Sequence, residues 1–357
     1  MNRLREFGCH IITSQHTIDE ILRLAILADK LSYDHVRIGD HVIVPNAEVS
    51  YPNAQTLLAA FGVLTKHVRI STAVTDCYRR HPVEIAQAIA TLDVLTHGRA
   101  VLGIGAGEMM NLSPFGIEWT KPVKRLREAV EVINLLLAST PKSPATYEGE
   151  IFSLKKAYLQ IKPVQKPRPP IYIGAAGCKT RELVGMVGDG WLPVGVESPQ
   201  TLKKHLLDVK NGAERTSRQI SNIDIDVTVY TAVDEDIENA YRVVSPAVKS
   251  MLVQQREVLR ELTGLEVPEN LSLQRIDPTD KERLMSFEEM VKQVPRSAVE
   301  DVAAFGPIDS VIGKLEEFLG AGATSLTICI IGLDHEKTLR TYAEKIIPYL
   351  KETYGSH

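Results

Sequence analysis

Short apolar runs alternate along the chain with longer segments in which apolar residues recur at helical spacing. The runs contain few polar residues, which is typical of strands covered on both faces, as in parallel sheets. They predict strands at residues 6–12, 35–39, 68–74, 100–104, 171–173, 188–193, 223–233 and 326–331. The segments of helical spacing predict helices at residues 17–30, 54–65, 82–95, 123–137, 177–187 and 335–351, and another that starts near residue 199.

Eight strands that alternate with helices predict a (β/α)8 barrel, or TIM barrel, built by residues 1–357 as a single domain. A doubly wound open sheet is the alternative arrangement of the same elements. Residues 234–299 are too long for one ordinary connection, and their charged helical pattern predicts an insertion before the last helix–strand pair. Residues 147–161 predict a smaller excursion that contains a β-hairpin.

The predicted fourth strand runs into a glycine-rich turn that ends in an acid, Gly103-Ile104-Gly105-Ala106-Gly107-Glu108. Glu108 stands where the dinucleotide fingerprint G-x-G-x-x-G requires its third glycine, so the turn is a poor Rossmann signal. The carboxyl ends of parallel strands form the active-site face of a barrel, and we expect Glu108 at that face. The alternative is a plain strand exit with a solvated glutamate.

Other polar groups follow the remaining predicted strands. Asp40-His41 follows the second strand, residues 174–177 form a glycine-containing turn after the fifth, and Trp191 lies on the sixth. Histidine can transfer a proton near neutral pH, and backbone N–H groups at a helix start can bind phosphate. Each group has a structural alternative: a helix-capping pair, a tight turn, or a core tryptophan. Residues 79–81 are interpreted as a solvated basic loop, with contact to an acidic ligand tail as the alternative.

The composition is that of an ordinary globular protein, with 357 residues, 44% hydrophobic and 24% charged. A formal charge of −4 shows no excess of basic residues of the kind that binds nucleic acid, so we expect no nucleic-acid partner. No apolar run approaches the roughly 20 residues that span a bilayer, and the N-terminal sequence does not resemble a signal peptide. We therefore expect no membrane partner and a cytoplasmic location.

The four cysteines lie far apart without a C-x-x-C motif, which predicts free thiols in a reducing cytoplasm. No H-x-H, H-E-x-x-H or clustered Cys/His pattern occurs, so we expect no metal. The chain also lacks the G-x-S-x-G motif of serine hydrolases.

Four sequence segments carry a family resemblance: DHVIVP (40–45), ISTAVTDCYRRHP (70–82), IAQAIATLDVLTHGRAVLGIGAGE (85–108) and GDGW (188–191). They resemble the luciferase-like family of flavin- and deazaflavin-dependent oxidoreductases, and within it the enzymes that use coenzyme F420, an 8-hydroxy-5-deazaflavin. ATLDVLTHGRAVLGIG and FGIEWTKPV are similar to methylenetetrahydromethanopterin reductases. GAGEMMN is similar to F420-dependent alcohol and glucose-6-phosphate dehydrogenases. FMN is the alternative cofactor.

The resemblance implies roles for individual residues. His41 and Glu108 match the proton-transfer pair of the alcohol and sugar enzymes, and a non-prolyl cis peptide is expected at Ala73–Val74, behind the deazaflavin ring. The positions that match cofactor contacts are Asp40, Ala73, Val74, Thr75, Ala106, Gly107, Asn111, Ala176, Gly177, Lys179 and Thr180. Lys179 and Thr180 are expected near the phosphate and acidic tail.

Three further positions are expected to contact the substrate: His10, Trp191 and Glu197. Glu197 stands where the sugar-phosphate enzymes have a phosphate-binding lysine, which argues against glucose 6-phosphate. His10 stands where the reductases usually have a glutamate.

The implied function is hydride transfer between C5 of coenzyme F420 and a small organic molecule. It is most like that of a 5,10-methylenetetrahydromethanopterin reductase. The alternatives are an F420-dependent alcohol or sugar dehydrogenase and an FMN-dependent monooxygenase, with a non-catalytic cofactor-binding barrel the weakest. The resemblance also implies a homodimer, for which we expect the second and third helices to form the interface.

Overall fold

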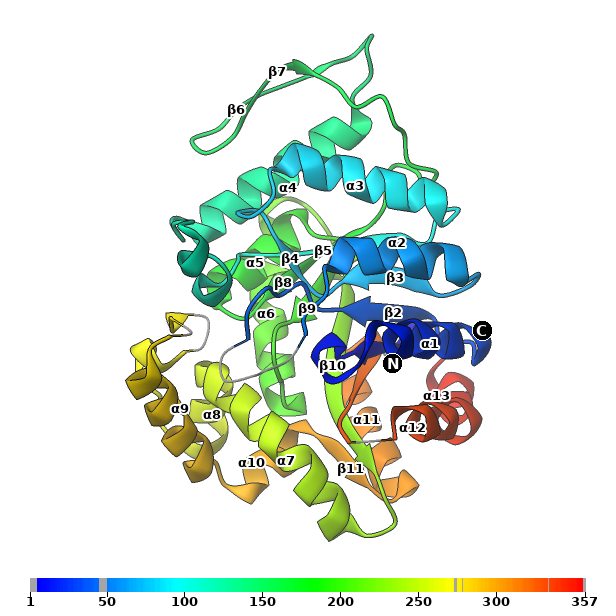
Figure 1. The fold of residues 1–357 in the computed structure, drawn as a ribbon, viewed down its shortest axis with the longest axis vertical. Coiled ribbons are helices and arrows are strands. Elements are labelled where there is room, and N and C mark those ends of the chain that lie inside the picture. The colour runs from blue at the N-terminus through cyan, green and yellow to red at the C-terminus, as the bar shows by residue number, and fades with distance from the viewer. Residues whose placement is uncertain (1–4, 45–49, 273–274, 278, 333, 356–357) are drawn as a thin grey trace.

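Eight parallel strands close into a barrel at the centre of the molecule (Figure 1). The computed structural model describes residues 5–44, 50–272, 275–277, 279–332 and 334–355. The barrel strands are β1 (Glu6–Ile11), β2 (His35–Ile38), β3 (Arg69–Thr72), β5 (Ala100–Gly105), β8 (Ile171–Ala175), β9 (Gly190–Pro193), β10 (Asp224–Val233) and β12 (Ser325–Ile330). Each pairs in parallel with the next, and β12 closes the ring against β1. The predicted TIM barrel is therefore confirmed, and the open sheet is excluded.

Helices cover the outside of this barrel. They are α1 (Ile18–Lys30), α2 (Ala54–Leu64), α3 (Pro82–Leu95), α4 (Pro122–Ala138), α5 (Cys178–Val187), α6 (Pro199–Arg215), α11 (Ile308–Ala321), α12 (His335–Thr341) and α13 (Ile347–Tyr354). The predicted closing helix is divided by a π-helical turn, Tyr342–Ile346. Pro348 explains the division, because it has no N–H to donate to the preceding turn.

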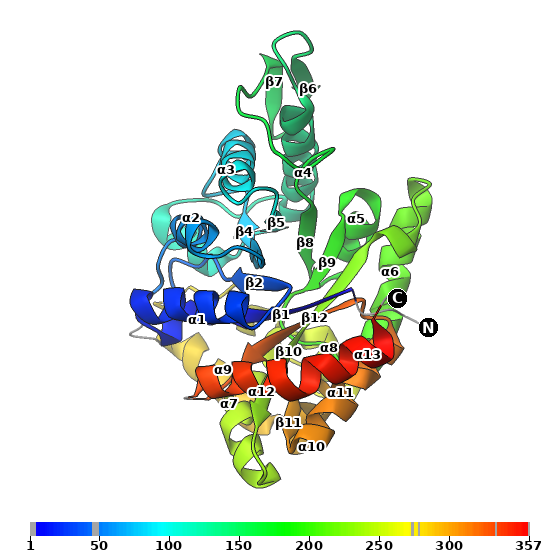
Figure 2. The same ribbon diagram turned by 90° about the vertical axis from the view of Figure 1, so that its right-hand side faces the viewer.

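Shorter elements lie in the segments between the barrel strands and the helices. The 3₁₀ turns are η1 (Thr13–Gln15), η2 (Met109–Asn111), η3 (Ser113–Phe115), η4 (Ile220–Asn222) and η5 (Glu269–Leu271), and a short strand β4 (Thr75–Asp76) pairs with β5. The predicted hairpin is confirmed as the antiparallel pair β6 (Ala145–Glu148) and β7 (Ser153–Ala157). It projects from the end of the molecule beyond α4 (Figure 2). Residues 45–49, which include the end of the DHVIVP segment, lie outside the described residues.

The long connection between β10 and α11 contains four helices, α7 (Ile237–Gln254), α8 (Arg256–Thr263), α9 (Lys281–Gln293) and α10 (Arg296–Val302). They gather at one side of the barrel, at the lower left of Figure 1, around their own apolar cluster. A short strand that the sequence did not predict, β11 (Ala304–Gly306), pairs with the end of β10. Three residues show too little pattern to be recognised as a strand without their partner. The limits 234 and 299 of the insertion stay a prediction.

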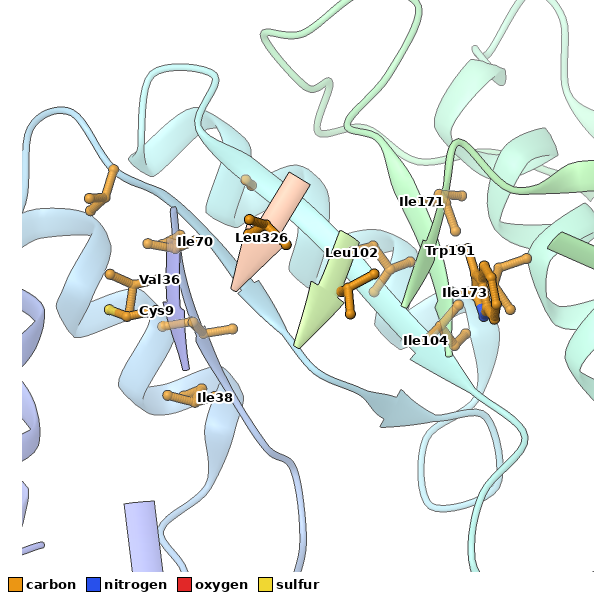
Figure 3. Close-up of a cluster of buried hydrophobic side chains, with 14 of the residues drawn as sticks. Cys9, Val36, Ile38, Ile70, Leu102, Ile104, Ile171, Ile173, Trp191 and Leu326 are labelled. Atoms are coloured by element: carbon orange, nitrogen blue, oxygen red, sulfur yellow. The ribbon is translucent and has the colours of Figure 1, made fainter. Parts of the chain in front are cut away.

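The two faces of β2 differ in polarity. Val36 and Ile38 belong to the apolar layer between barrel and helices, part of which is shown in Figure 3. Arg37, on the other face, forms an ion pair with Asp226 of β10, and both side chains are almost fully buried. Because β2 and β10 are not neighbours, this ion pair crosses the barrel interior.

No helix of the described residues is both long and apolar enough to cross a membrane. All four cysteines are free thiols, and three of them are buried.

Candidate active site

The carboxyl ends of the barrel strands surround a cavity of about 1010 Å³. Every barrel strand contributes lining residues, most of them from its end or the loop that follows and, for β10, from the middle of the strand. Ligand pockets usually have volumes of about 300–1000 Å³, so this cavity has room for a large cofactor together with a substrate. Its position is the active-site face that the sequence predicted for Glu108.

Most of the predicted site residues line this cavity. They are His10, Asp40, His41, Ala73, Val74, Thr75, Ala106, Gly107, Glu108, Asn111, Ala176, Gly177 and Thr180. These residues come from β1, the loops after β2, β3 and β5, and the start of α5. The closed barrel therefore brings together groups that are far apart in the sequence.

Lys179, Trp191 and Glu197 are not part of the cavity lining. Trp191 is fully buried in the layer between barrel and helices, where its Nε1 donates a hydrogen bond to the Ala175 carbonyl at 2.9 Å. The alternation of β9 places Trp191 on its outer face and Leu192 toward the cavity. The expected substrate contacts of Trp191 and Glu197 are therefore not supported by their placement.

Three side chains form a hydrogen-bonded group at one wall of the cavity. His41 Nδ1 lies 3.3 Å from Glu108 Oε2, and Asn111 Nδ2 lies 3.0 Å from His41 Nδ1 and 3.2 Å from Glu108 Oε2. The Asn111 amide is oriented by its oxygen, which accepts hydrogen bonds from the backbone N–H groups of Val42 and Ile43. Its NH2 group must therefore face His41 and Glu108.

The charges of His41 and Glu108 stabilise each other. Burial alone would lower the pKa of His41, but the Glu108 carboxylate more than offsets burial and the pKa is raised. Burial alone would raise the pKa of Glu108, but His41 and Asn111 lower it. The pair is thus favoured as imidazolium and carboxylate. The two side chains retain 28% and 23% exposure, so both are accessible from the cavity.

Asp40 is held by a basic cluster that the sequence interpretation missed. Its Oδ2 accepts hydrogen bonds from Thr75 Oγ1 at 2.7 Å, Arg80 Nη1 at 2.7 Å and Arg79 Nη2 at 3.0 Å. The expectation of a solvated basic loop was wrong for Arg79 and Arg80, whose side chains are 12% and 10% exposed. The sequence did contain a signal for this contact. The basic pair Arg79-Arg80 follows β3, which lies beside β2, and Asp40 follows β2.

The backbone also shapes the cavity. The peptide bond Ala73–Val74 is cis, as expected. The neighbouring strand ends are glycines that leave room for Val74, since a Cβ on Gly105 would lie 2.6 Å from Val74 Cγ2. Gly177 is the N-cap of α5, whose first N–H groups lie beside the cavity and suit an anion such as a phosphate. These features fit a planar ring with a phosphate-bearing tail.

Other lining residues were not singled out as site residues from the sequence. The ring of Tyr51 contacts His41 edge-on, with centroids 5.2 Å apart, and Trp119 Nε1 donates to the Ala106 carbonyl at 2.9 Å. Helices α7 and α9 add an apolar wall of Met251, Leu284, Phe287 and Val291. Whether these α7 and α9 side chains line the cavity depends on how the long connection folds over the barrel. Local periodicity in the sequence does not predict that packing.

A parallel barrel with a paired histidine and glutamate, a helix N-terminus and a large cavity at the carboxyl ends of its strands has the architecture of a TIM-barrel enzyme. The model of the luciferase-like monooxygenase family matches residues 3–325. The chain therefore belongs to this family.

Its relatives include F420-dependent enzymes. The F420-dependent glucose-6-phosphate dehydrogenase of Microbacterium testaceum is 30% identical over 355 residues, which cover 98% of each chain. The 5,10-methylenetetrahydromethanopterin reductase of Archaeoglobus fulgidus is 29% identical over 326 residues, covering 91% of this chain and 94% of the reductase. A solved structure of an F420-dependent secondary alcohol dehydrogenase, in complex with an F420-acetone adduct, has a TM-score of 0.79 and 26% identity, covering 98% of this chain and 99% of the dehydrogenase.

Proposed function

We propose that this protein is a coenzyme F420-dependent oxidoreductase that transfers a hydride between C5 of the deazaflavin and an organic substrate. Among the reactions of its relatives, that of a 5,10-methylenetetrahydromethanopterin reductase is the first candidate. The observation that carries the proposal is the group of His41, Glu108 and Asn111 in the wall of the large cavity. The coenzyme supplies the hydride chemistry when bound, and the chain supplies position and protonation.

The chain's own residues fit this division of work. The anion-binding start of α5 suits the phosphate of the coenzyme, and the strand-end glycines let its ring lie close to the backbone. Reduction of the N–CH2–N bridge of a methylene-pterin by hydride breaks one C–N bond, and the nitrogen released takes up a proton. The His41 imidazolium can donate one, and Glu108 stabilises its charge until transfer.

The lining charges favour a large ring-containing substrate over a sugar phosphate. Among the described lining residues, the arginines and the lysine are already paired: Arg79 with Asp40 and Asp76, Arg275 with Glu269, and Lys292 with Glu289. A dianionic phosphate would have to compete with the buried carboxylates of Asp40 and Asp76 for Arg79, whereas the other two pairs are exposed and weak. Glu197, which argued against glucose 6-phosphate from the sequence, does not line the cavity, so its charge does not act on a bound phosphate there. The apolar wall of α7 and α9 suits a bulky ring system.

A second candidate, F420-dependent oxidation of a secondary alcohol, is favoured by the same acid–base pair. Removal of a hydride from an alcohol carbon releases the hydroxyl proton. In its deprotonated state, with the remaining ring proton on Nδ1 and donated to Glu108, His41 can accept that proton at Nε2. The direction of proton transfer therefore distinguishes the two candidates.

The test is an anaerobic titration with reduced F420, followed by methylenetetrahydromethanopterin, and a parallel assay with oxidised F420 and secondary alcohols. We expect tight F420 binding and its oxidation by the pterin. Reduction of F420 by an alcohol, without reaction with the pterin, would select the second candidate. Binding of FMN without binding of F420 would overturn both and favour the FMN-dependent monooxygenase.

We further propose that the enzyme is a cytoplasmic homodimer that associates through α2 and α3. Both helices carry exposed apolar side chains, namely Val63, Leu64, Val83, Val94 and Leu95. Sedimentation equilibrium should give twice the chain mass. The Leu64→Lys variant should shift the equilibrium toward monomer, whereas an unchanged mass would exclude this interface.

A further inference from the structure

A second cluster of ionisable side chains lies outside the active-site cavity, where α8 packs beside α6 (Figure 1). It consists of His205 on α6 and of Glu257 and Glu261, one turn apart on α8. One ligand atom from each lies within 4.8 Å of the others. We infer that these three residues bind a divalent transition-metal ion such as Zn²⁺. From the sequence we expected no metal, because no clustered motif occurs. The ligands come from two separate helices, so no local motif marks them.

His205 is oriented as metal-binding histidines are. Its Nδ1 lies 3.0 and 3.1 Å from the two carboxylate oxygens of Glu197, which also accepts a hydrogen bond from Thr201 at 2.5 Å. Glu197 directly precedes Ser198, the N-cap of α6, where the positive helix end favours a carboxylate. The carboxylate therefore holds the proton on Nδ1 and leaves Nε2 to bind a metal, the usual carboxylate–histidine–metal arrangement.

The Nε2 atom of His205 is the observation that points to a ligand. The side chain is 1% exposed, and Nε2 has no hydrogen-bond partner among the described residues. Its nearest charged neighbour is Glu257 Oε1 at 3.6 Å, too far for the roughly 2.7–2.9 Å of a charge-assisted hydrogen bond. In a tetrahedral zinc site with bonds of about 2.0–2.2 Å, ligand atoms lie about 3.3–3.6 Å apart. The 3.6 Å between His205 Nε2 and Glu257 Oε1 matches that spacing, and the ligand atom of Glu261 lies within 4.8 Å of both.

The charge of the cluster also favours a dication. Glu197, Asp208, Glu257 and Glu261 contribute four carboxylates, while Arg181 and Lys204 contribute two cations, so two negative charges are left. Arg181 uses Oε2 of Glu257 at 3.1 Å, and Lys204 uses Oε1 of Glu261. Oε1 of Glu257 faces His205.

The metal would join α8, in the long connection between β10 and α11, to α6 of the barrel at the edge of the active site. Residue Gln255, which directly precedes α8, lines the cavity, and so does Ala176, whose carbonyl accepts a hydrogen bond from Arg181. A metal bound between α6 and α8 would therefore stabilise this side of the cavity. The expected role is structural, because no ligand in the set lines the cavity.

The test is titration of the chelator-treated full-length protein with Co²⁺, followed by displacement with Zn²⁺. We expect one Co²⁺ per chain with the visible absorption of a low-coordinate site, and a higher melting temperature with Zn²⁺. The Glu197→Gln variant should weaken Zn²⁺ binding by about 10–100-fold, the usual effect of losing such a supporting carboxylate. Glu261→Gln should weaken it at least as much.

The matched control is Glu289→Gln, which removes an exposed glutamate that is paired with Lys292 on α9. It should leave Zn²⁺ affinity unchanged. The proposal is overturned if no site saturates at one metal per chain, or if Glu261→Gln and Glu289→Gln bind Zn²⁺ equally. Nitrogen NMR of His205 provides a readout that does not depend on the variants. A doubly protonated ring that Zn²⁺ leaves unchanged would show an ion pair instead of a metal site.

Discussion

Proton transfer in the cavity depends on the state of two neighbouring side chains. His41 and Glu108 are 3.3 Å apart, and each shifts the pKa of the other toward the charged form. Asn111 adds direction, because its carbonyl oxygen is occupied by two backbone N–H groups and its NH2 group can only donate. A neutral His41 would accept that hydrogen bond at Nδ1, which would leave its proton on Nε2.

At the residue scale, Glu108→Gln should lower turnover by about 10²-fold or more, the usual contribution of a positioned acid–base group. F420 affinity should stay within a few-fold, because the amide keeps the shape of the side chain. Steady-state kinetics and fluorescence titration measure the two effects. Glu118→Gln, at an exposed glutamate, is the control. Unchanged turnover in the Glu108 variant would contradict its role.

The same variant should change the titration of His41. In the wild type the pKa of His41 lies above its usual value, so the imidazolium persists as pH rises through about 6.5. Without the Glu108 charge, burial and nearby Arg79 disfavour the imidazolium, and the pKa should fall below 6.5. NMR titration of the His41 ring measures this. A pKa that stays raised in Glu108→Gln would show that another group stabilises the charge.

At the scale of elements, the strand β5 depends on glycines for its packing. A Cβ on Gly103 would lie 1.9 Å from the backbone oxygen of Thr72 on β3, a contact that neither strand can relieve by moving a side chain. The glycine pattern that predicted a ligand-binding turn therefore has a second cause, which is close strand packing below the cavity.

Gly103→Ala should lower the free energy of unfolding by about 1–3 kcal/mol or more, as overpacking does. Gly313→Ala is the matched control in α11, where a Cβ would meet no atom within 4 Å. There we expect stabilisation by about 0.5–1 kcal/mol, because alanine restricts the unfolded chain and favours the helix. Urea unfolding of both variants measures the contrast, and equal effects would refute the packing argument.

At the scale of the whole molecule, the barrel interior contains charge. Arg37 and Asp226 are 2% and 0% exposed, and Thr327 also donates a hydrogen bond to Asp226 at 2.7 Å. This ion pair joins the first third of the chain to strand β10 across the barrel. Removing one partner would leave the other charge buried without compensation.

Asp226→Asn should therefore lower the free energy of unfolding by about 3–5 kcal/mol. The double variant Arg37→Met/Asp226→Leu should cost less than the sum of the two single variants, because no buried charge is left. Glu336→Gln, in an exposed pair with Arg340, should cost about 0.5 kcal/mol or less. A small effect of Asp226→Asn in denaturant unfolding would show that water or structural relaxation compensates the charge.

Local pattern predicted the strands and helices well because each depends on neighbouring residues. The capping box of Thr17 and Glu20 begins α1 close to its predicted start, and Pro82 occupies the first turn of α3. Prediction was poorer where the outcome depends on a distant partner. Strand β11 forms because it can pair with the end of β10. On β9, side chains alternate between the two faces, so Leu192 faces the cavity and Trp191 faces away from it.

The sequence by itself determined the order of strands and helices, the barrel class, and the placement of His41, Glu108 and the glycine-rich turns at strand ends. These features follow from periodicity and turn chemistry within a few residues. The tertiary structure decided which side chains meet: Asp40 with Arg79, Arg37 with Asp226, and His205 with Glu257. The physical reason is that these contacts depend on closure of the barrel and on packing of the long connection against it. Neither is encoded in the spacing of neighbouring residues.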